Sequence, residues 1–246
     1  MQKISIHISR NLLTMGFIIT LVGIIWFFIS LPKADKPPPS KISNYIEKIE
    51  QFALQIFNQK HKQSNFIEAE TYYSFKQAPA LLKKPKVTTF DEQGKERHLL
   101  VAKRANYFSN GEIKLKGKVN IKAKSGANYQ IDTEEISVDT KANSLKSSKK
   151  IIYNDGKSKI IAQGMNMDYA SNKMNLTGKI KIMQKGGQQI LTRDLLVDQQ
   201  KDNVIYQTPE KVHYQSKAAN IHAKGMHYDS KAQKIKLTGG VIGLYE

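Results

Sequence analysis

Apolar and polar residues alternate strictly along several segments of this chain. In the clearest segment, from Ile113 to Ala123, every odd position is apolar or glycine and every even position is polar. Side chains two residues apart point to the same side of a β-strand, so the pattern predicts a strand with one buried and one solvated face. The same alternation runs through Met174–Ile182 and Ile235–Val241. We therefore expect strands in all three segments.

These segments are copies of one another. Ala162–Asp168 matches Ala223–Asp229, Thr133–Asp139 matches Thr192–Asp198, and Leu176-Thr177-Gly178 matches Leu237-Thr238-Gly239. The spacing indicates a repeating unit of about 60 residues built from several short strands. Turn signals separate the strands at Ser109-Asn110-Gly111, Ser125-Gly126, Asp155-Gly156, Ser171-Asn172-Lys173 and Lys185-Gly186-Gly187. Because no long helical pattern interrupts the repeat, the fold class is all-β with an antiparallel sheet.

Glycine recurs at one position of the repeat, as Gly117, Gly178 and Gly239. A glycine within a strand marks a sharp bend or leaves space beside the backbone, and both interpretations stay open here. The third copy stops at Glu246 after its first strands, which predicts an unpaired sheet edge. We expect that edge to dock another β protein through Val241, Ile242, Leu244 and Tyr245.

The N-terminal segment has a different pattern. No charged residue occurs from Leu12 to Leu31, which matches the roughly 20 residues that a helix needs to cross a bilayer. We predict a cytoplasmic N-terminus at 1–11, a transmembrane helix at 12–31 and a stiff Pro-rich linker at 32–40. A cleaved signal peptide is the alternative, but its apolar region is usually shorter and ends in small residues.

Helical spacing of apolar residues follows the linker. Ile42, Ile46, Ile49, Phe52 and Ile56 recur at three- and four-residue intervals with polar residues between them, which predicts an amphipathic helix at 41–62. It would cap the β-domain at 63–246, or else lie on the membrane or a partner.

Lys and Arg outnumber Asp and Glu by 39 to 21, and the net charge is +18. Such a surface attracts polyanions or anionic membranes, although it also serves solubility alone. Nucleic-acid binding would need a basic patch with interleaved aromatic residues, and the lysines here are instead spread through alternating strands, so we expect no nucleic-acid partner. The chain has no cysteine, which excludes disulfides and thiolate metal sites.

Catalytic signatures are missing from the sequence. We find no nucleophile elbow, phosphate loop or HExxH motif, and expect no catalytic residues, no metal site and no cofactor. His222 and His227 lie within one repeat copy, but the preceding copy has Ile161 and Asn166 there. The recurring aspartates, Asp139/Asp198 and Asp168/Asp229, sit at strand ends, where the side chain of Asp usually bonds its own turn.

The repeated A-x-G-M-x-x-D and L-T-G segments, behind one N-terminal anchor and with a basic balance, resemble the OstA-like periplasmic family of the lipopolysaccharide export (Lpt) machinery, in its LptC-type anchored branch. The resemblance implies a twisted, open antiparallel β-jellyroll in the periplasm, held by one helix in the cell inner membrane. It implies that the chain binds lipopolysaccharide received from the inner-membrane Lpt ABC transporter and passes it to a soluble LptA-like bridge protein. The family has no catalytic residues to carry over.

Under this resemblance the apolar strand faces form a trough for acyl chains, and lysines beside them face the lipid phosphates. The candidate trough residues are Ile113, Leu115, Val119, Ile121, Ile136, Val138, Leu176, Ile180 and Ile182. The candidate phosphate-facing residues are Lys114, Lys116, Lys118, Lys179 and Lys181. The main alternative is an anchored β scaffold whose apolar set is only a closed core. An anchored nucleic-acid binder is a third hypothesis, which the dispersed lysines disfavour.

Overall fold

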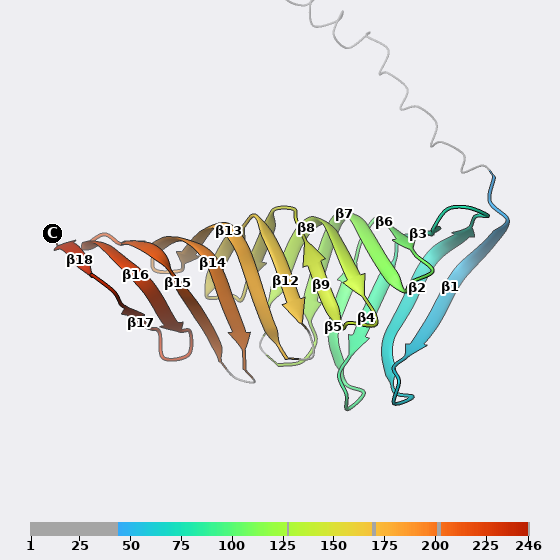
Figure 1. Ribbon diagram of the computed structural model, residues 1–246, viewed down its shortest axis with the longest axis horizontal. Coiled ribbons are helices and arrows are strands. Elements are labelled where there is room, and N and C mark those ends of the chain that lie inside the picture. Colours follow the sequence, from blue (N-terminus) through green and yellow to red (C-terminus); the bar gives the residue numbers. More distant parts are fainter. Residues whose placement is uncertain (1–43, 127, 169–170, 201–202, 246) are drawn as a thin grey trace, which may run out of the picture. The chain divides into compact units, whose positions relative to one another are not determined.

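The computed structural model describes residues 44–126, 128–168, 171–200 and 203–245, and these residues form 18 β-strands in one sheet (Figure 1). The all-β prediction is confirmed, and the arrangement fits the expected twisted jellyroll. The strands are β1 (Glu47–Phe57), β2 (Gln63–Ser74), β3 (Ala80–Lys83), β4 (Lys86–Phe90), β5 (Glu96–Val101), β6 (Arg104–Tyr107), β7 (Glu112–Ala123), β8 (Gln130–Asp139), β9 (Ser144–Ser147), β10 (Ile151–Asn154), β11 (Ser158–Ala162), β12 (Gly164–Asp168), β13 (Lys173–Gln184), β14 (Gln189–Gln199), β15 (Val204–Gln215), β16 (Ala219–Asp229), β17 (Lys234–Leu237) and β18 (Ile242–Tyr245).

Every pairing in the sheet is antiparallel, and the sheet is a meander once each pair of short strands is counted as one interrupted strand. Short strands come in pairs that act as one strand interrupted at its middle: β3 with β4, β5 with β6, β9 with β10, β11 with β12, and β17 with β18. For example, one half of β8 pairs with β9 and the other half with β10. The consecutive strands follow one another along the length of the sheet, from β1 at one end to β18 at the other (Figure 1).

A line of bends runs across the middle of the strands, and we call it the crease. The ladder of β7 with β8 is interrupted between Lys116 and Val119, and that of β13 with β14 between Leu176 and Lys179. Gly117 and Gly178 lie in these bulges with φ of 80° and 81°. This left-handed backbone conformation has a low free-energy cost for glycine, because glycine has no Cβ. Of the two interpretations left open by the sequence, the structure supports the bend at Gly117 and Gly178.

The crease divides the sheet into two leaves that face each other. Leaf 1 contains β4, β5, β10, β11 and β18, leaf 2 contains β3, β6, β9, β12 and β17, and the long strands contribute one half to each. Inward-facing side chains of both leaves form one hydrophobic cluster that extends from Ile67 to Tyr228. The core is therefore the space between the leaves, and the outer faces carry the polar positions of each strand.

The predicted amphipathic helix at 41–62 is wrong over Glu47–Phe57, which is strand β1. Its apolar residues fit either period, because Phe52, Leu54 and Ile56 also alternate with Ala53 and Gln55. Pairing decides the outcome: β1 forms an antiparallel ladder with β2 from Glu47 opposite Ser74 to Phe57 opposite Gln63. An edge strand is stabilised by backbone hydrogen bonds to a partner strand and by packing of its inner face. The spacing of apolar residues within the segment does not show whether such a partner exists. The β structure thus begins at Glu47, earlier than the predicted boundary at 63.

The predicted transmembrane helix at 12–31 and the linker at 32–40 lie outside the described residues. Within the described ranges, no helix has the length and apolarity needed to cross a bilayer.

Candidate functional site

The structure brings the nine predicted trough residues together on the inner faces of the leaves. All nine belong to the single core cluster, and each is at most 2% exposed. Ile113 lies opposite Val138 and Leu115 opposite Ile136, so strands β7 and β8 present one continuous apolar surface. The alternation predicted from the sequence is confirmed. In this structure the two inner faces pack against each other, and a guest between them would have to displace that packing.

The rims of the leaves, formed by the turns, meet opposite the crease along a line that we call the seam. A row of buried tyrosines follows it. Tyr129 and Tyr153 of leaf 1 stack with ring centroids 5.4 Å apart, Tyr153 meets Tyr206 of leaf 2 edge-on at 6.5 Å, and Tyr206 stacks on Tyr228 at 5.6 Å. All four rings are at most 4% exposed. Sequence periodicity could not reveal this row, because its members come from distant hairpins.

Polar contacts fasten the same seam. The hydroxyl of Tyr206 donates a hydrogen bond to the Asp155 carboxylate across the seam, and the ammonium of Lys157 donates to the carbonyl oxygen of Ser230 at 2.9 Å. Burial, followed by the nearby Tyr153 and Asp155, raises the pKa of Tyr206 well above its ordinary value. The phenol therefore stays protonated and available as a donor at physiological pH.

A buried histidine marks the leaf-1 side of the seam near Tyr129. The two nitrogens of His98 lie 3.1 Å from the Thr89 hydroxyl and 2.5 Å from the Tyr129 hydroxyl. Burial, together with the charge of Arg97, lowers the pKa of His98 to about 3. The ring is therefore neutral, and it serves here as a structural hydrogen-bonding group.

The rims meet with an offset along the chain. The turn that contains Lys157 in leaf 1 contacts Ser230 of leaf 2, and one hollow of about 300 Å³ is lined by Arg97 of leaf 1 and Asn172 of leaf 2. Leaf 1 thus meets leaf-2 residues from strands much later in the sequence, as expected when strands are tilted and the sheet is twisted. The offset leaves the first turns of leaf 2 and the last turns of leaf 1 without an opposing rim.

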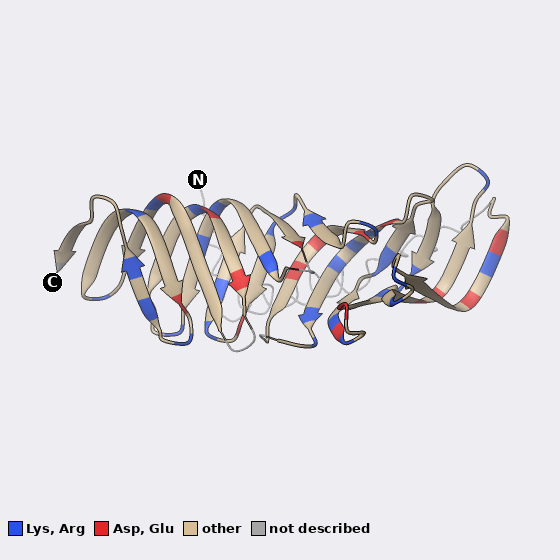
Figure 2. Ribbon diagram, turned by 60° about the horizontal axis from the view of Figure 1, so that its bottom comes forward, with Lys and Arg blue, Asp and Glu red and all other residues tan. Residues whose placement is uncertain are grey.

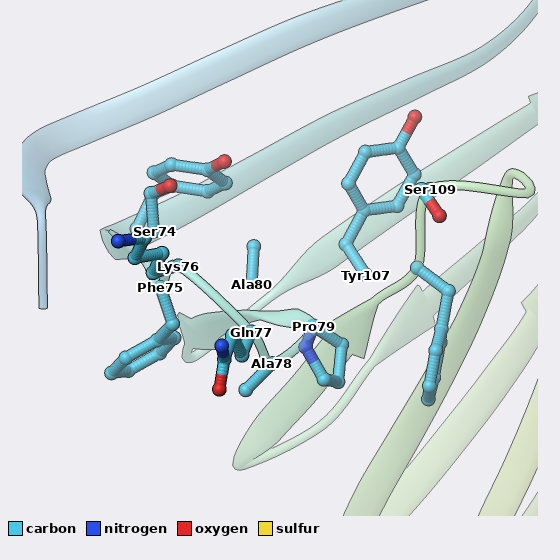
Figure 3. A pocket seen from close by; sticks show the side chains of 11 residues that line it. Ser74, Phe75, Lys76, Gln77, Ala78, Pro79, Ala80, Tyr107 and Ser109 are labelled. Atoms are coloured by element: carbon cyan, nitrogen blue, oxygen red, sulfur yellow. The ribbon is translucent and has the colours of Figure 1, made fainter.

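The uncovered part of leaf 2 holds a hollow of about 520 Å³ near the β1 end of the sheet (Figure 3). It is lined by residues of leaf 2 and its turns, 72, 74–80 and 107–109. Tyr72 and Tyr107 lie on the inner face, since they pair with Leu82 and Ile113, and Tyr72 stacks with Phe52 at 4.6 Å. The hollow therefore opens onto the apolar interior, and we call it the mouth. The alternation of apolar and polar residues does not predict this hollow.

The five predicted phosphate-facing lysines lie on the outer faces. Lys114 and Lys116 approach Glu135 at 3.3 and 3.4 Å, and Lys118 occupies the crease with φ of 52°. Lys179 and Lys181 lie on the outside of leaf 1 (β13), and Figure 2 shows basic residues on strands along the length of the sheet. The sheet itself separates these ammonium groups from the interior. Lys95 and Arg97 instead line the hollow of about 300 Å³ at the seam.

The predicted partner edge is a free strand edge. Among the described residues, β18 pairs only with β16, from Ile242 opposite His222 to Tyr245 opposite Ala219. Val241, Ile242 and Leu244 are 51%, 71% and 73% exposed, which is unusual for large apolar side chains. At the opposite end of the sheet, β1 has β2 as its one strand partner within the part of the chain that the structure describes.

Among the recurring aspartates, Asp139 and Asp229 bond their own turns, as predicted. The carboxylate of Asp139 accepts from the backbone amides of Lys141 and Ala142 at 3.0 and 2.9 Å, and that of Asp229 accepts from two amides at 2.9 Å. The bond from the Ala232 amide is the main cause that lowers the pKa of Asp229. Within the described part of the chain, no group of His, Asp and Glu side chains could hold a metal ion.

A comparison with protein families agrees with this architecture. The model of a family described as "Lipopolysaccharide-assembly, LptC-related" matches residues 17–183 and 167–246. No curated protein matches the chain.

Proposed function

Because the chain belongs to the LptC-related lipopolysaccharide-assembly family, we propose that the interior between its two leaves carries the acyl chains of lipopolysaccharide. The observation that supports this most strongly is the mouth, a hollow of about 520 Å³ whose lining includes Tyr72 and Tyr107, two half-buried side chains that pack against the apolar core. Acyl chains entering there would pass Tyr72 and Tyr107 and then lie along Leu115 and its neighbours. The site has binding surfaces, and its proposed role is transport, not catalysis.

We further propose a direction of movement. The mouth lies at the β1 end, which follows the segment predicted to anchor the chain in the inner membrane, and the free edge of β18 lies at the other end of the sheet. The lipid would thus be received near the inner-membrane ABC transporter and passed in the periplasm to a soluble bridge protein docked on β18. Phosphate groups would remain at the seam, where the ammonium of Lys95 supplies a positive charge and the planar guanidinium of Arg97 can donate two parallel hydrogen bonds.

Passage along the interior requires the leaves to separate. The inner residues are closed in this structure, so acyl chains must replace side-chain contacts between the leaves with contacts of their own. Such an exchange of one apolar contact for another costs little compared with exposing the same surface to water. The hydrogen bonds across the seam, from Tyr206 to Asp155 and from Lys157 to Ser230, would then be the main barrier to opening.

A photo-crosslinking experiment in cells tests the proposal. The photoreactive residue p-benzoyl-phenylalanine would replace Tyr107 in the mouth, Leu115 in the interior, or Lys122 on the outer face of β7. We expect lipopolysaccharide adducts at Tyr107 and Leu115 and none at Lys122. Replacing Tyr107 keeps an aromatic side chain in a half-buried position, so this variant remains informative if the Leu115 variant misfolds. Absence of adducts at both positions, or equal adducts at Lys122, would contradict the proposal.

The closed core favours a second candidate function, an anchored scaffold that binds a protein through β18 and carries no lipid. Deleting 241–246 distinguishes the two. A scaffold would lose its partner without any change in lipid handling, whereas a transporter would retain its lipid adduct at Tyr107 and fail to pass the lipid on.

A further inference from the structure

A second hollow lies in leaf 1 and opens on its outer face. Its lining combines the outward-facing Ile161, Lys181 and Leu191 with Ala162, Ile180 and Thr192, which are buried toward the interior. The hollow has a volume of about 550 Å³, which falls within the usual range for small-molecule sites. Its floor contains Ile161 of β11 and Leu191 of β14, which flank Lys181 in one row across three strands. The hollow sits where β11 gives way to β12 beside the bulge of β13, so neighbouring strands diverge there.

Apolar side chains are unexpected on this face. Leu191 is 39% exposed and Ile161 half-buried, and Ile152 extends the row as the cross-strand neighbour of Ile161. A single exposed leucine would need no explanation, but two outward apolar residues that line one hollow, with a third beside them, resemble a binding surface. The floor thus offers contact for a short alkyl chain.

The wall of the hollow is cationic. Lys150, Lys179 and Lys181 line it together with the amide of Gln163, and no carboxylate does. None of the ion pairs between described residues involves any of these three lysines, although Lys114 and Lys116 on the neighbouring repeat share Glu135. Three ammonium groups that form no ion pair among the described residues, beside an apolar floor, attract an anion, and an ammonium is a compact point charge suited to phosphate.

We propose that this outer hollow binds a single anionic amphiphile, with its alkyl chain on Ile161 and Leu191 and its phosphate or carboxylate among Lys150, Lys179 and Lys181. The two requirements, an apolar floor and a cationic wall, exclude a neutral lipid and a free inorganic anion as good ligands. Lys179 and Lys181 thus face a phosphate outside the sheet and not at the rim of the interior. The lining includes the inner residue Ile180, so the site borders the interior, but the proposed binding does not require transport through it.

A fluorescence titration tests this site. The chain has no cysteine, so Ile152→Cys gives a single attachment point for a bimane label beside the hollow. The labelled full-length chain, in nanodiscs of zwitterionic lipid, would be titrated with octyl phosphate, octyl glucoside and inorganic phosphate. We expect saturable binding of octyl phosphate, and binding at least tenfold weaker for the other two, since each lacks one of the two required groups.

Matched variants locate the binding. Lys179→Glu with Lys181→Glu should weaken octyl phosphate binding at least tenfold. Lys122→Glu with Lys146→Glu, which changes the net charge equally at exposed outer positions elsewhere, should leave it within twofold. Equal binding of octyl phosphate and octyl glucoside would overturn the proposal, and so would equal losses in the two double variants. Failure of lipopolysaccharide crosslinking at Tyr107 and Leu115 would leave this result unaffected.

Discussion

The hydroxyl of Tyr206 in leaf 2 donates a hydrogen bond to the carboxylate of Asp155 in leaf 1, although the two residues lie 51 positions apart in the chain. The same carboxylate accepts from the backbone amides of Lys157 and Ser158 at 2.9 and 2.6 Å, which holds it in place at the rim. One aspartate therefore shapes a turn and fastens the seam between the leaves.

Tyr206→Phe should lower the free energy of unfolding by about 1–2 kcal/mol, because the Asp155 carboxylate loses a donor while the ring stays buried. Urea denaturation followed by circular dichroism measures the change. Tyr214→Phe is the matched control on the same strand, since Tyr214 is half-buried and outside the tyrosine row. Equal effects of the two substitutions would show that the bond across the seam contributes nothing specific.

Stability should fall as the pH drops below 6.5, because His98 has a pKa of about 3 in the folded protein and about 6.5 when unfolded. Between these values the unfolded chain binds a proton that the folded chain does not. The contribution is fully present above pH 6.5 and is lost toward pH 3, by at most about 1.4 kcal/mol per pH unit.

Urea midpoints at pH 7.5, 6.5 and 5.5 check this dependence on His98. His98→Gln should show a shallower loss over that interval, and His61→Gln, at an exposed position, should keep the wild-type slope. A slope unchanged by His98→Gln would mean that other groups cause the acid sensitivity.

Gly178→Ala should destabilise the protein more than Gly94→Ala. Both glycines have a positive φ, 81° and 80°, which costs an alanine about 1–2 kcal/mol. At Gly178 the new Cβ would also lie 2.8 Å from the Cβ of Gln163, whereas nothing lies within 4 Å at Gly94. We expect an additional loss of about 1–3 kcal/mol at the crease, measured by thermal or urea unfolding. Similar losses at both sites would refute close packing there.

Ile242→Lys combined with Leu244→Lys should reduce capture of the soluble bridge protein without unfolding the chain. Both side chains are largely exposed, so the stability should change by less than about 0.5 kcal/mol for each. Charged side chains at a sheet edge disfavour further strand pairing. A pull-down with purified bridge protein measures the effect, and Val101→Lys, exposed on β5 away from the edge, is the control. Undiminished capture would place the docking surface elsewhere.

Local pattern was enough to predict much of this fold. The period of two along β7 and β13 identifies Ile113, Leu115 and Ile180 as inward-facing, because side-chain direction in a strand follows from position alone. The bends at Gly117 and Gly178 were predictable for a similar reason, since the required left-handed conformation is cheap only for glycine. The turns closed by Asp139 and Asp229 depend on bonds within a few residues.

Features that depend on distant partners were not predictable in this way. Glu47–Phe57 has apolar residues at both helical and strand spacing, and only its ladder with β2 makes it a strand. The seam joins Tyr153 to Tyr206 because the leaves fold onto each other with an offset, which also uncovers the mouth at Tyr107. Alternation along each strand places the lysines next to the inner residues on the outer faces. How far these lysines lie from the rims depends on the positions of the crease and the seam, which only the folded structure shows. The alternation of apolar and polar residues thus determines which face of each strand is buried. What that face packs against is determined by contacts between the two leaves, which join residues far apart in the sequence.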